Sequence, residues 1–102
     1  MTSKFLHVGF NFEPRPIKVE ELLTAFNLAA GWVRYAPNCW IICTHETPEQ
    51  WARRLRPYLS EYDSVLVLEV PMDGETSYGW LPKNIWDWIN QTKAAISAKV
   101  QT

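Results

Sequence analysis

The order of strand-like and helix-like patterns is the feature that most constrains how this chain can fold. Residues 4–12, KFLHVGFNF, alternate between an apolar face and a mixed face, which is typical of a strand. Residues 18–30 carry apolar side chains at helical spacing and predict a helix that ends at Gly31. The segments WVRYA and CWIICT, at residues 32–36 and 39–44, then predict two strands joined as a hairpin.

The clearest helix start in the chain lies in the segment THETPEQ. Thr47 is expected to be the N-cap, Pro48 the first helical residue and Gln50 the partner that completes a capping box. After this helix, residues 64–70, SVLVLEV, form a nearly continuous apolar run. Such a run predicts a central strand that is covered on both faces. A last helix, which starts close to Pro82, completes the pattern.

The resulting order, βαββαβ with a C-terminal helix, predicts an α+β protein with a ferredoxin-like sandwich. In that architecture two helices cover one face of an antiparallel sheet. We expect one domain over residues 1–96 and a frayed tail at 97–102. Because strands such as 39–44 are apolar on both sides, the second face of the sheet needs a cover. The C-terminal helix and a second copy of the chain are both candidates for that cover.

The overall charge of the chain excludes a strongly basic protein. Lys plus Arg is 10 and Asp plus Glu is 11, so the net charge is -1 and any contact with nucleic acid needs a local patch. The N-terminal segment lacks the pattern of a signal peptide, and no apolar run approaches the roughly 20 residues that span a bilayer. We therefore expect a soluble cytoplasmic protein with no membrane partner.

The two cysteines, Cys39 and Cys43, lie four residues apart on one predicted strand. Their Cα atoms would then be roughly 13 Å apart, which is too far for a disulfide or for two ligands of one zinc ion. We interpret both as small core thiols, and the sequence predicts no metal site.

Three arginines, Arg53, Arg54 and Arg56, cluster on the predicted second helix. They are candidates for phosphate contacts with a nucleic acid. The alternative, which we favour, is a solvated helix face on which Glu49 and Glu61 lie nearby.

Several aromatic and polar residues have no obvious place in a single-chain core. His7 and Asn11 share the mixed face of the first strand, where a single histidine is more often a hydrogen-bonded structural residue than a ligand. Trp32, Trp40 and Trp80 are also hard to place, and tryptophan is enriched in protein interfaces. We therefore expect His7, Asn11, Trp40 and Trp80 to be candidates for a dimer seam.

Two segments of the chain are similar to a known family. NCWIICTHETPEQWARRLRPYLSEYDSVLVLEV, followed by GWLPKNIWDWI, resembles the small ferredoxin-like proteins related to the CRISPR-associated protein Cas-two. The similarity is strongest to the bacterial branch often labelled SinR-family. It covers about residues 4–90, and the segment from GWLP to WDWI is its most specific part. The resemblance implies a homodimer of ferredoxin-like units.

The resemblance also points to one strand end as the place to look for catalysis. In nuclease members of the family, a strand-end aspartate from each protomer meets its twin, and the pair binds a divalent metal for phosphodiester hydrolysis. The matching position in this chain is Asn11, which has no negative charge. Mg²⁺ is normally held by at least one or two carboxylates, and hydrolysis needs the ion to activate a water. Glu13, two residues further along, is the weak candidate for a replacement.

The sequence therefore favours a non-catalytic homodimeric module that binds a protein or nucleic-acid partner and needs no cofactor. The alternative is a metal-dependent, endoribonuclease-like endonuclease that uses Mg²⁺ and in which Glu13 replaces the missing aspartate. Only the resemblance supports this alternative, and a fold does not fix a function. A small-ligand sensor on the same fold has no positive feature in the sequence.

Overall fold

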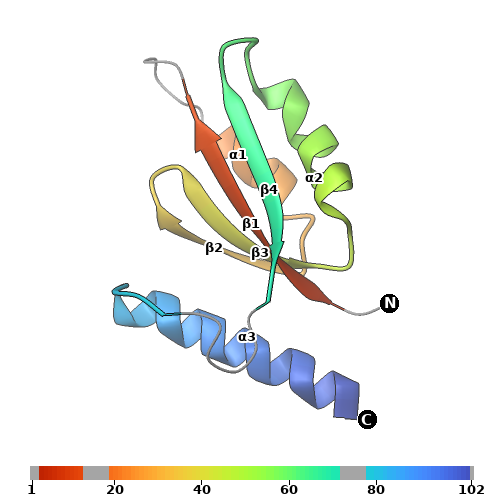
Figure 1. The fold of residues 1–102 in the computed structure, drawn as a ribbon, viewed down its shortest axis with the longest axis vertical. Coiled ribbons are helices and arrows are strands. Elements are labelled where there is room, and N and C mark those ends of the chain that lie inside the picture. The colour runs from red at the N-terminus through yellow and green to blue at the C-terminus, as the bar shows by residue number, and fades with distance from the viewer. Residues whose placement is uncertain (1–2, 13–18, 72–77, 102) are drawn as a thin grey trace.

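The computed structural model describes residues 3–12, 19–71 and 78–101, with side chains described as far as residue 96. These residues form a four-stranded sheet and three α-helices (Figure 1). In chain order the elements are β1 (Lys4–Asn11), α1 (Val19–Phe26), β2 (Gly31–Ala36), β3 (Cys39–Thr44), α2 (Pro48–Leu55), a short 3₁₀ turn (Arg56–Tyr58), β4 (Ser64–Val70) and α3 (Lys83–Gln101). The predicted α+β class is confirmed.

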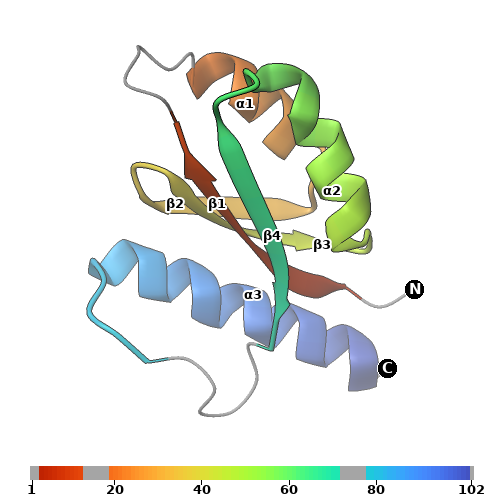
Figure 2. The ribbon, with the colours of Figure 1, turned by 45° about the horizontal axis from the view of Figure 1, so that its top comes forward.

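The sheet has the strand order β2-β3-β1-β4, and every neighbouring pair is antiparallel. Helices α1 and α2 lie on one face of the sheet and α3 crosses the other (Figure 2). The architecture is compatible with a ferredoxin-like fold to which a third helix has been added. Helix α3 continues to Gln101, and the fraying predicted from residue 97 stays a prediction.

The main core lies between the sheet and helices α1 and α2. Alternate residues of β1 and β3 point into it, as the period-two pattern of the first strand predicts. At its centre the ring of Phe26 stacks on Trp40 and on Trp51, with ring centroids 4.9 Å and 6.0 Å away. Both tryptophans are fully buried. This aromatic stack joins α1, α2 and β3 into one unit.

A second, smaller core lies between the other face of the sheet and α3. Phe5, Ile41 and Cys43 from the sheet pack against Ile85 and Ile89 of the helix, and all five are buried. Of the two candidates for a cover, the C-terminal helix therefore occupies this part of the second face. The part that α3 covers no longer argues for a second copy of the chain.

Strand β4 differs from the prediction made for it. A central strand covered on both faces was expected, but β4 is an edge strand that pairs only with β1 in the described sheet. Leu66 and Leu68, which lie opposite Gly9 and His7 on the α3 side of the sheet, are 61% and 47% exposed. The prediction was wrong because a run of apolar residues shows only that both faces of the strand are apolar, not that both are covered. Helix α3 does not reach this end of the second face.

Helix α1 is shorter than residues 18–30. It starts at Val19 and ends at Phe26, and Gly31 opens β2 instead of ending the helix. Tight turns connect α1 to β2. In them the Leu28 amide donates to the Ala25 carbonyl and the Ala29 amide to the Phe26 carbonyl. The Ala30 amide then donates to the Cys43 carbonyl and starts the sheet pairing early.

The predicted start of α2 is confirmed in detail. Thr47 has an extended backbone, its hydroxyl accepts a hydrogen bond from the Gln50 amide at 3.1 Å, and the Gln50 side chain accepts one from the Thr47 amide at 2.8 Å. Pro48 occupies the first helical position, where its missing N–H costs nothing. The capping box therefore satisfies two amides that a bare helix end would leave unpaired.

Replacing the Thr47 hydroxyl is expected to weaken the fold measurably. Thr47→Ala leaves the Gln50 amide without its acceptor and should lower the free energy of unfolding by about 1 kcal/mol. Thr24→Ala is the matched control, because Thr24 is an exposed residue inside α1 where alanine is the better helix former. Urea unfolding midpoints of the two variants give the comparison. Equal midpoints would show that the cap adds nothing to stability.

Candidate functional site

A pocket of about 490 Å³ opens between the α3 face of the sheet and the chain segment that leads into α3. Its sheet wall holds a polar pair, His7 of β1 and Tyr35 of β2. Apolar side chains form most of the rest, and Tyr78 and Trp80 lie at its rim. Ligand sites usually combine mostly apolar walls with a few convergent polar groups, so this is the candidate site.

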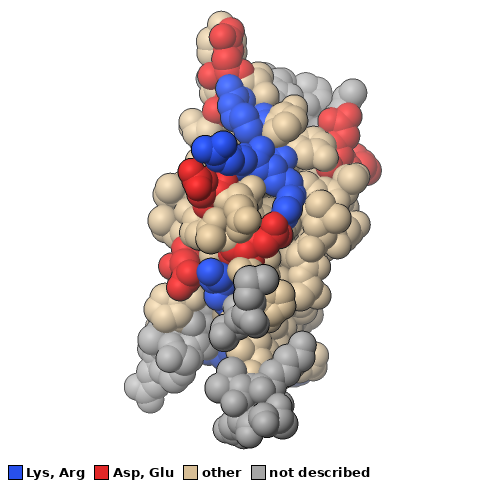
Figure 3. All heavy atoms as spheres, turned by 90° about the vertical axis from the view of Figure 1, so that its right-hand side faces the viewer, with Lys and Arg blue, Asp and Glu red and all other residues tan. Residues whose placement is uncertain are grey.

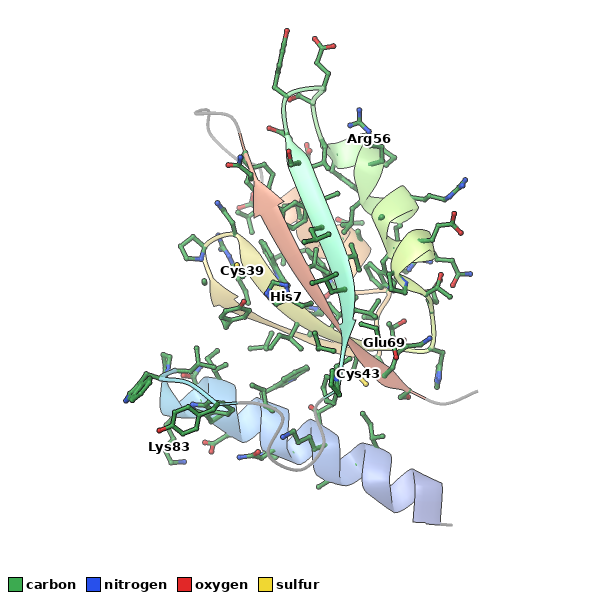
Figure 4. The ribbon with its side chains drawn as sticks, viewed as in Figure 1. His7, Cys39, Cys43, Arg56, Glu69 and Lys83 are labelled. Carbon is green, nitrogen blue, oxygen red and sulfur yellow. The ribbon has the colours of Figure 1, made fainter. Side chains whose placement is uncertain are left out.

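His7 reaches the pocket because β1 alternates. It lies between Phe5 and Gly9 on the α3 face, in the middle of the sheet (Figure 4). Gly9 lies beside the ring, and a Cβ at position 9 would sit 3.4 Å from Cε1 of His7, in van der Waals contact with it.

Tyr35 reaches the same face through an irregularity in β2. Ala36 pairs with Cys39 at the turn, and a regular hairpin would then set Tyr35 opposite Trp40, on the α1–α2 face. Instead Arg34 pairs with Trp40, so β2 carries one extra residue at this point. A bulge of this kind re-aims a side chain. Here it turns the phenol toward His7.

The two side chains form a hydrogen-bonded pair. Nε2 of His7 meets the Tyr35 hydroxyl, and the ring centroids are 5.6 Å apart. Burial lowers the pKa of His7 below its usual 6.5, so the imidazole is neutral at pH 7. Burial, followed by the hydrogen bond and charge of neighbouring Cys39, raises the pKa of Tyr35 to about 12. The pair is therefore uncharged at physiological pH.

The aromatic rim is unusually exposed. Trp80 is 88% exposed, and its ring makes an edge contact with Tyr78 at a centroid distance of 5.5 Å. Tyr78 is exposed as well. Large aromatic side chains are normally buried, and an exposed pair beside a pocket is a feature that packing does not explain.

The predicted seam residues divide between different places. His7 and Trp80 line the same pocket, whereas Asn11 is exposed at the end of β1, opposite Ser64 of β4. Trp40 needs a correction: it is fully buried in the main core against Phe26, so it has no surface that a second chain could touch. Glu13 lies outside the residues that the structure describes.

The three arginines are all engaged by their own chain. Arg54 makes two hydrogen bonds to the Glu46 carboxylate, at 2.7 Å and 2.6 Å, and this contact lowers the pKa of Glu46. Arg53 pairs with Glu49 at 3.3 Å, and Arg56 donates to main-chain carbonyls at the end of the 3₁₀ turn. Figure 3 shows this side of the molecule, where basic atoms form a band bordered by acidic atoms. Phosphate contacts stay a prediction.

Metal-ligand chemistry finds little support in the described part of the chain. No group of three His, Cys, Asp or Glu side chains comes together there in a way that could hold an ion. No disulfide joins Cys39 and Cys43, as their spacing predicts, and Cys43 is buried while Cys39 is half-buried. Nor does any helix among residues 3–12, 19–71 and 78–101 combine the length and apolarity that crossing a membrane requires.

The pocket is the part of the site that sequence reasoning missed. The sequence predicts that His7 and Trp80 lie at a dimer seam, and it places Tyr35 only in a strand. Nothing in the sequence WVRYA indicates the bulge that turns Tyr35. A regular hairpin would place the Tyr35 side chain on the opposite face of the sheet. Comparison of the chain with protein-family models, with curated proteins and with solved structures finds no match in any of the three.

Proposed function

We propose that this chain is a non-catalytic binding module with a ferredoxin-like fold that works as a homodimer. The ferredoxin-like assignment is supported by the strand order β2-β3-β1-β4, by the antiparallel pairing and by the two helices that connect parallel strands on one face. It also agrees with the resemblance to proteins related to Cas-two. The proposal of a dimer rests on a single observation, the exposed apolar edge of the sheet at β4.

Strand β4 has few of the features that protect an edge from pairing. It is seven residues long, its register with β1 is regular from Phe5 to Asn11, and it contains no proline. Glu69 is its only charged residue, and that side chain lies on the other face, 3.6 Å from Lys4. Long, regular and apolar edges are templates for another strand.

The opposite edge of the sheet, β2, makes a useful contrast. It carries the bulge at Tyr35, which interrupts regular pairing. Its Arg34 guanidinium donates to the Pro37 carbonyl at 2.6 Å and lies 5.0 Å from the centre of the Trp40 ring. A bulge and a charged side chain both discourage strand addition, so β4 is the edge at which a second copy docks.

The sequence of β4 is complementary to itself. If a two-fold axis passes beside Val67, Leu66 of one copy lies opposite Leu68 of the other, and both leucine pairs fall on the α3 side. A net charge of -1 offers little repulsion to association. The same low charge, together with the engaged arginines, favours protein over nucleic acid as any further partner.

Sedimentation equilibrium at micromolar protein tests this proposal. The wild-type chain is expected to dimerise, and Leu66→Lys is expected to raise the dissociation constant by about tenfold or more, since the symmetric interface loses two buried leucines at once. Leu28→Lys is the matched control, because Leu28 is 66% exposed at the end of α1. A monomer at all concentrations, or a dimer that both variants weaken equally, would overturn the proposed interface.

The absence of catalysis also has a direct test. We expect RNA and DNA, single-stranded or duplex, to stay intact when incubated with the protein and Mg²⁺ or Mn²⁺, because the strand end offers the neutral Asn11. Asn11→Asp supplies the missing charge and is expected to bind the ions more tightly than the wild type. Cleavage that copurifies with the wild-type chain and disappears in Glu13→Gln would instead support the nuclease alternative.

A further inference from the structure

We propose that the pocket between β1, β2 and α3 binds a neutral, flat aromatic molecule that carries one hydrogen-bonding group. This inference is independent of the proposed dimer, because Leu66 and Leu68 do not line the pocket. It adds a small-molecule site to a chain whose sequence shows no sign of one.

The walls of the pocket select against charge. Ile41, Val70 and Ile89 are typical of the lining, and none of the described residues that line it is Lys, Arg, Asp or Glu. A charged ligand would meet no opposite charge among these described residues, and the hydration it loses there would be costly. The volume of about 490 Å³ is within the range of small-molecule sites. A neutral molecule with a large apolar surface fits these walls.

The polar pair supplies one anchoring point. Nε2 of His7 is occupied by the Tyr35 hydroxyl, which is the side-chain hydrogen-bond partner of His7 within the described residues. Nδ1 is the other ring nitrogen, and we assign the contact with the ligand to it. Because the imidazole is neutral, Nδ1 donates in one tautomer and accepts in the other. A hydroxyl or a ring N–H on the ligand satisfies either state.

The aromatic rim favours a flat ligand. Trp80 presents an almost fully exposed indole next to the pocket, and with Tyr78, which its ring contacts edge-on, it lines the rim with two rings. Stacked or edge-to-face contacts add stabilisation beyond the area they bury. A planar ring system can lie against this wall while its polar group reaches His7.

Isothermal titration of the full-length chain with three matched probes tests the proposal. Naphthol carries one hydroxyl, naphthalene carries none, and naphthoate replaces the hydroxyl with a carboxylate. Naphthol is expected to bind saturably at one site per chain, and naphthoate at least about tenfold more weakly, because its charge has no partner among the described lining residues. Naphthalene binding measures the apolar part of the interaction alone.

Three variants show whether the binding is in this pocket. Trp80→Ala is expected to weaken naphthol about fivefold to tenfold by removing the rim, and the exposed indole can be removed without loss of core packing. Tyr62→Ala is the matched control, since Tyr62 is 68% exposed before β4 and outside the pocket lining. His7→Leu should weaken naphthol about fivefold or more and leave naphthalene unchanged, which a merely structural histidine would not do.

Three results would overturn the proposal. No saturable binding of naphthol, or naphthoate binding as tight as that of naphthol, would overturn it. Naphthol binding that survives Trp80→Ala unchanged would place the ligand elsewhere and also overturn it. If His7→Leu fails to fold, Tyr35→Phe keeps the test decisive, because it removes only the hydroxyl that orients His7. Loss of naphthol affinity relative to naphthalene is the expected result in either variant.

Discussion

A chain that ends after Gly79 is expected to lose cooperative unfolding altogether. The truncation removes α3, and with it Ile85 and Ile89, which are both buried against the sheet. Burial of a large aliphatic side chain contributes about 1.5–3 kcal/mol, so these two residues alone account for about 3–6 kcal/mol. A domain of this size has a total stability of only about 5–15 kcal/mol. The truncation also bares Phe5, Ile41 and Cys43 on the sheet.

A second truncation provides the control for this result. Ending the chain after Ile96 keeps the described α3 side chains that pack in the second core. That shorter chain is expected to unfold close to the temperature of the full-length protein, measured by circular dichroism. If the chain that ends after Gly79 also unfolds cooperatively at that temperature, α3 is an appendage and the second core contributes little.

Removing the indole of Trp51 is expected to cost about 3–5 kcal/mol, the range for a fully buried large aromatic replaced by alanine. The ring is completely buried and stacks on Phe26. Its Nε1 donates to the Thr44 hydroxyl at 3.2 Å, and the Arg54 guanidinium lies 4.6 Å from the ring centre. Trp51→Ala therefore disturbs α1, α2 and the end of β3 together.

Thr44→Val separates the polar part of this effect from the packing part. It removes the acceptor of the indole N–H and of the Glu46 amide while it keeps the volume of the side chain. We expect a loss of about 1–3 kcal/mol for leaving those donors unpaired, less than for Trp51→Ala. Urea unfolding of both variants measures the difference. A smaller loss for Trp51→Ala than for Thr44→Val would contradict the role given to the aromatic stack.

Much of the fold could be predicted because the sequence patterns that indicate its elements are local. The alternation in β1, the helical spacing before Phe26 and the capping box at Thr47 each depend on neighbouring residues. The place of β4 could not be predicted in this way. SVLVLEV shows that both faces of the strand are apolar, but whether a helix covers the second face depends on where α3 crosses the sheet.

The candidate site was much harder to predict than the fold. His7 and Trp80 are far apart in sequence, and only the path of the chain into α3 brings them to one pocket. Tyr35 joins them through a one-residue slip in the hairpin, and such a slip moves a side chain to the opposite face. The prediction for Trp40 was wrong for a related reason. Tertiary packing decides which face of β3 the two helices bury.

Amide hydrogen exchange at low and high protein concentration tests the proposed dimer most directly. NMR resolves the individual amides of β4, and those that point away from β1 exchange with solvent in a single chain. We predict that alternate amides of β4 become protected as the concentration rises, while the β2 edge is unchanged. Protection that does not depend on concentration, or that appears at β2 instead of β4, would contradict a homodimer formed through β4.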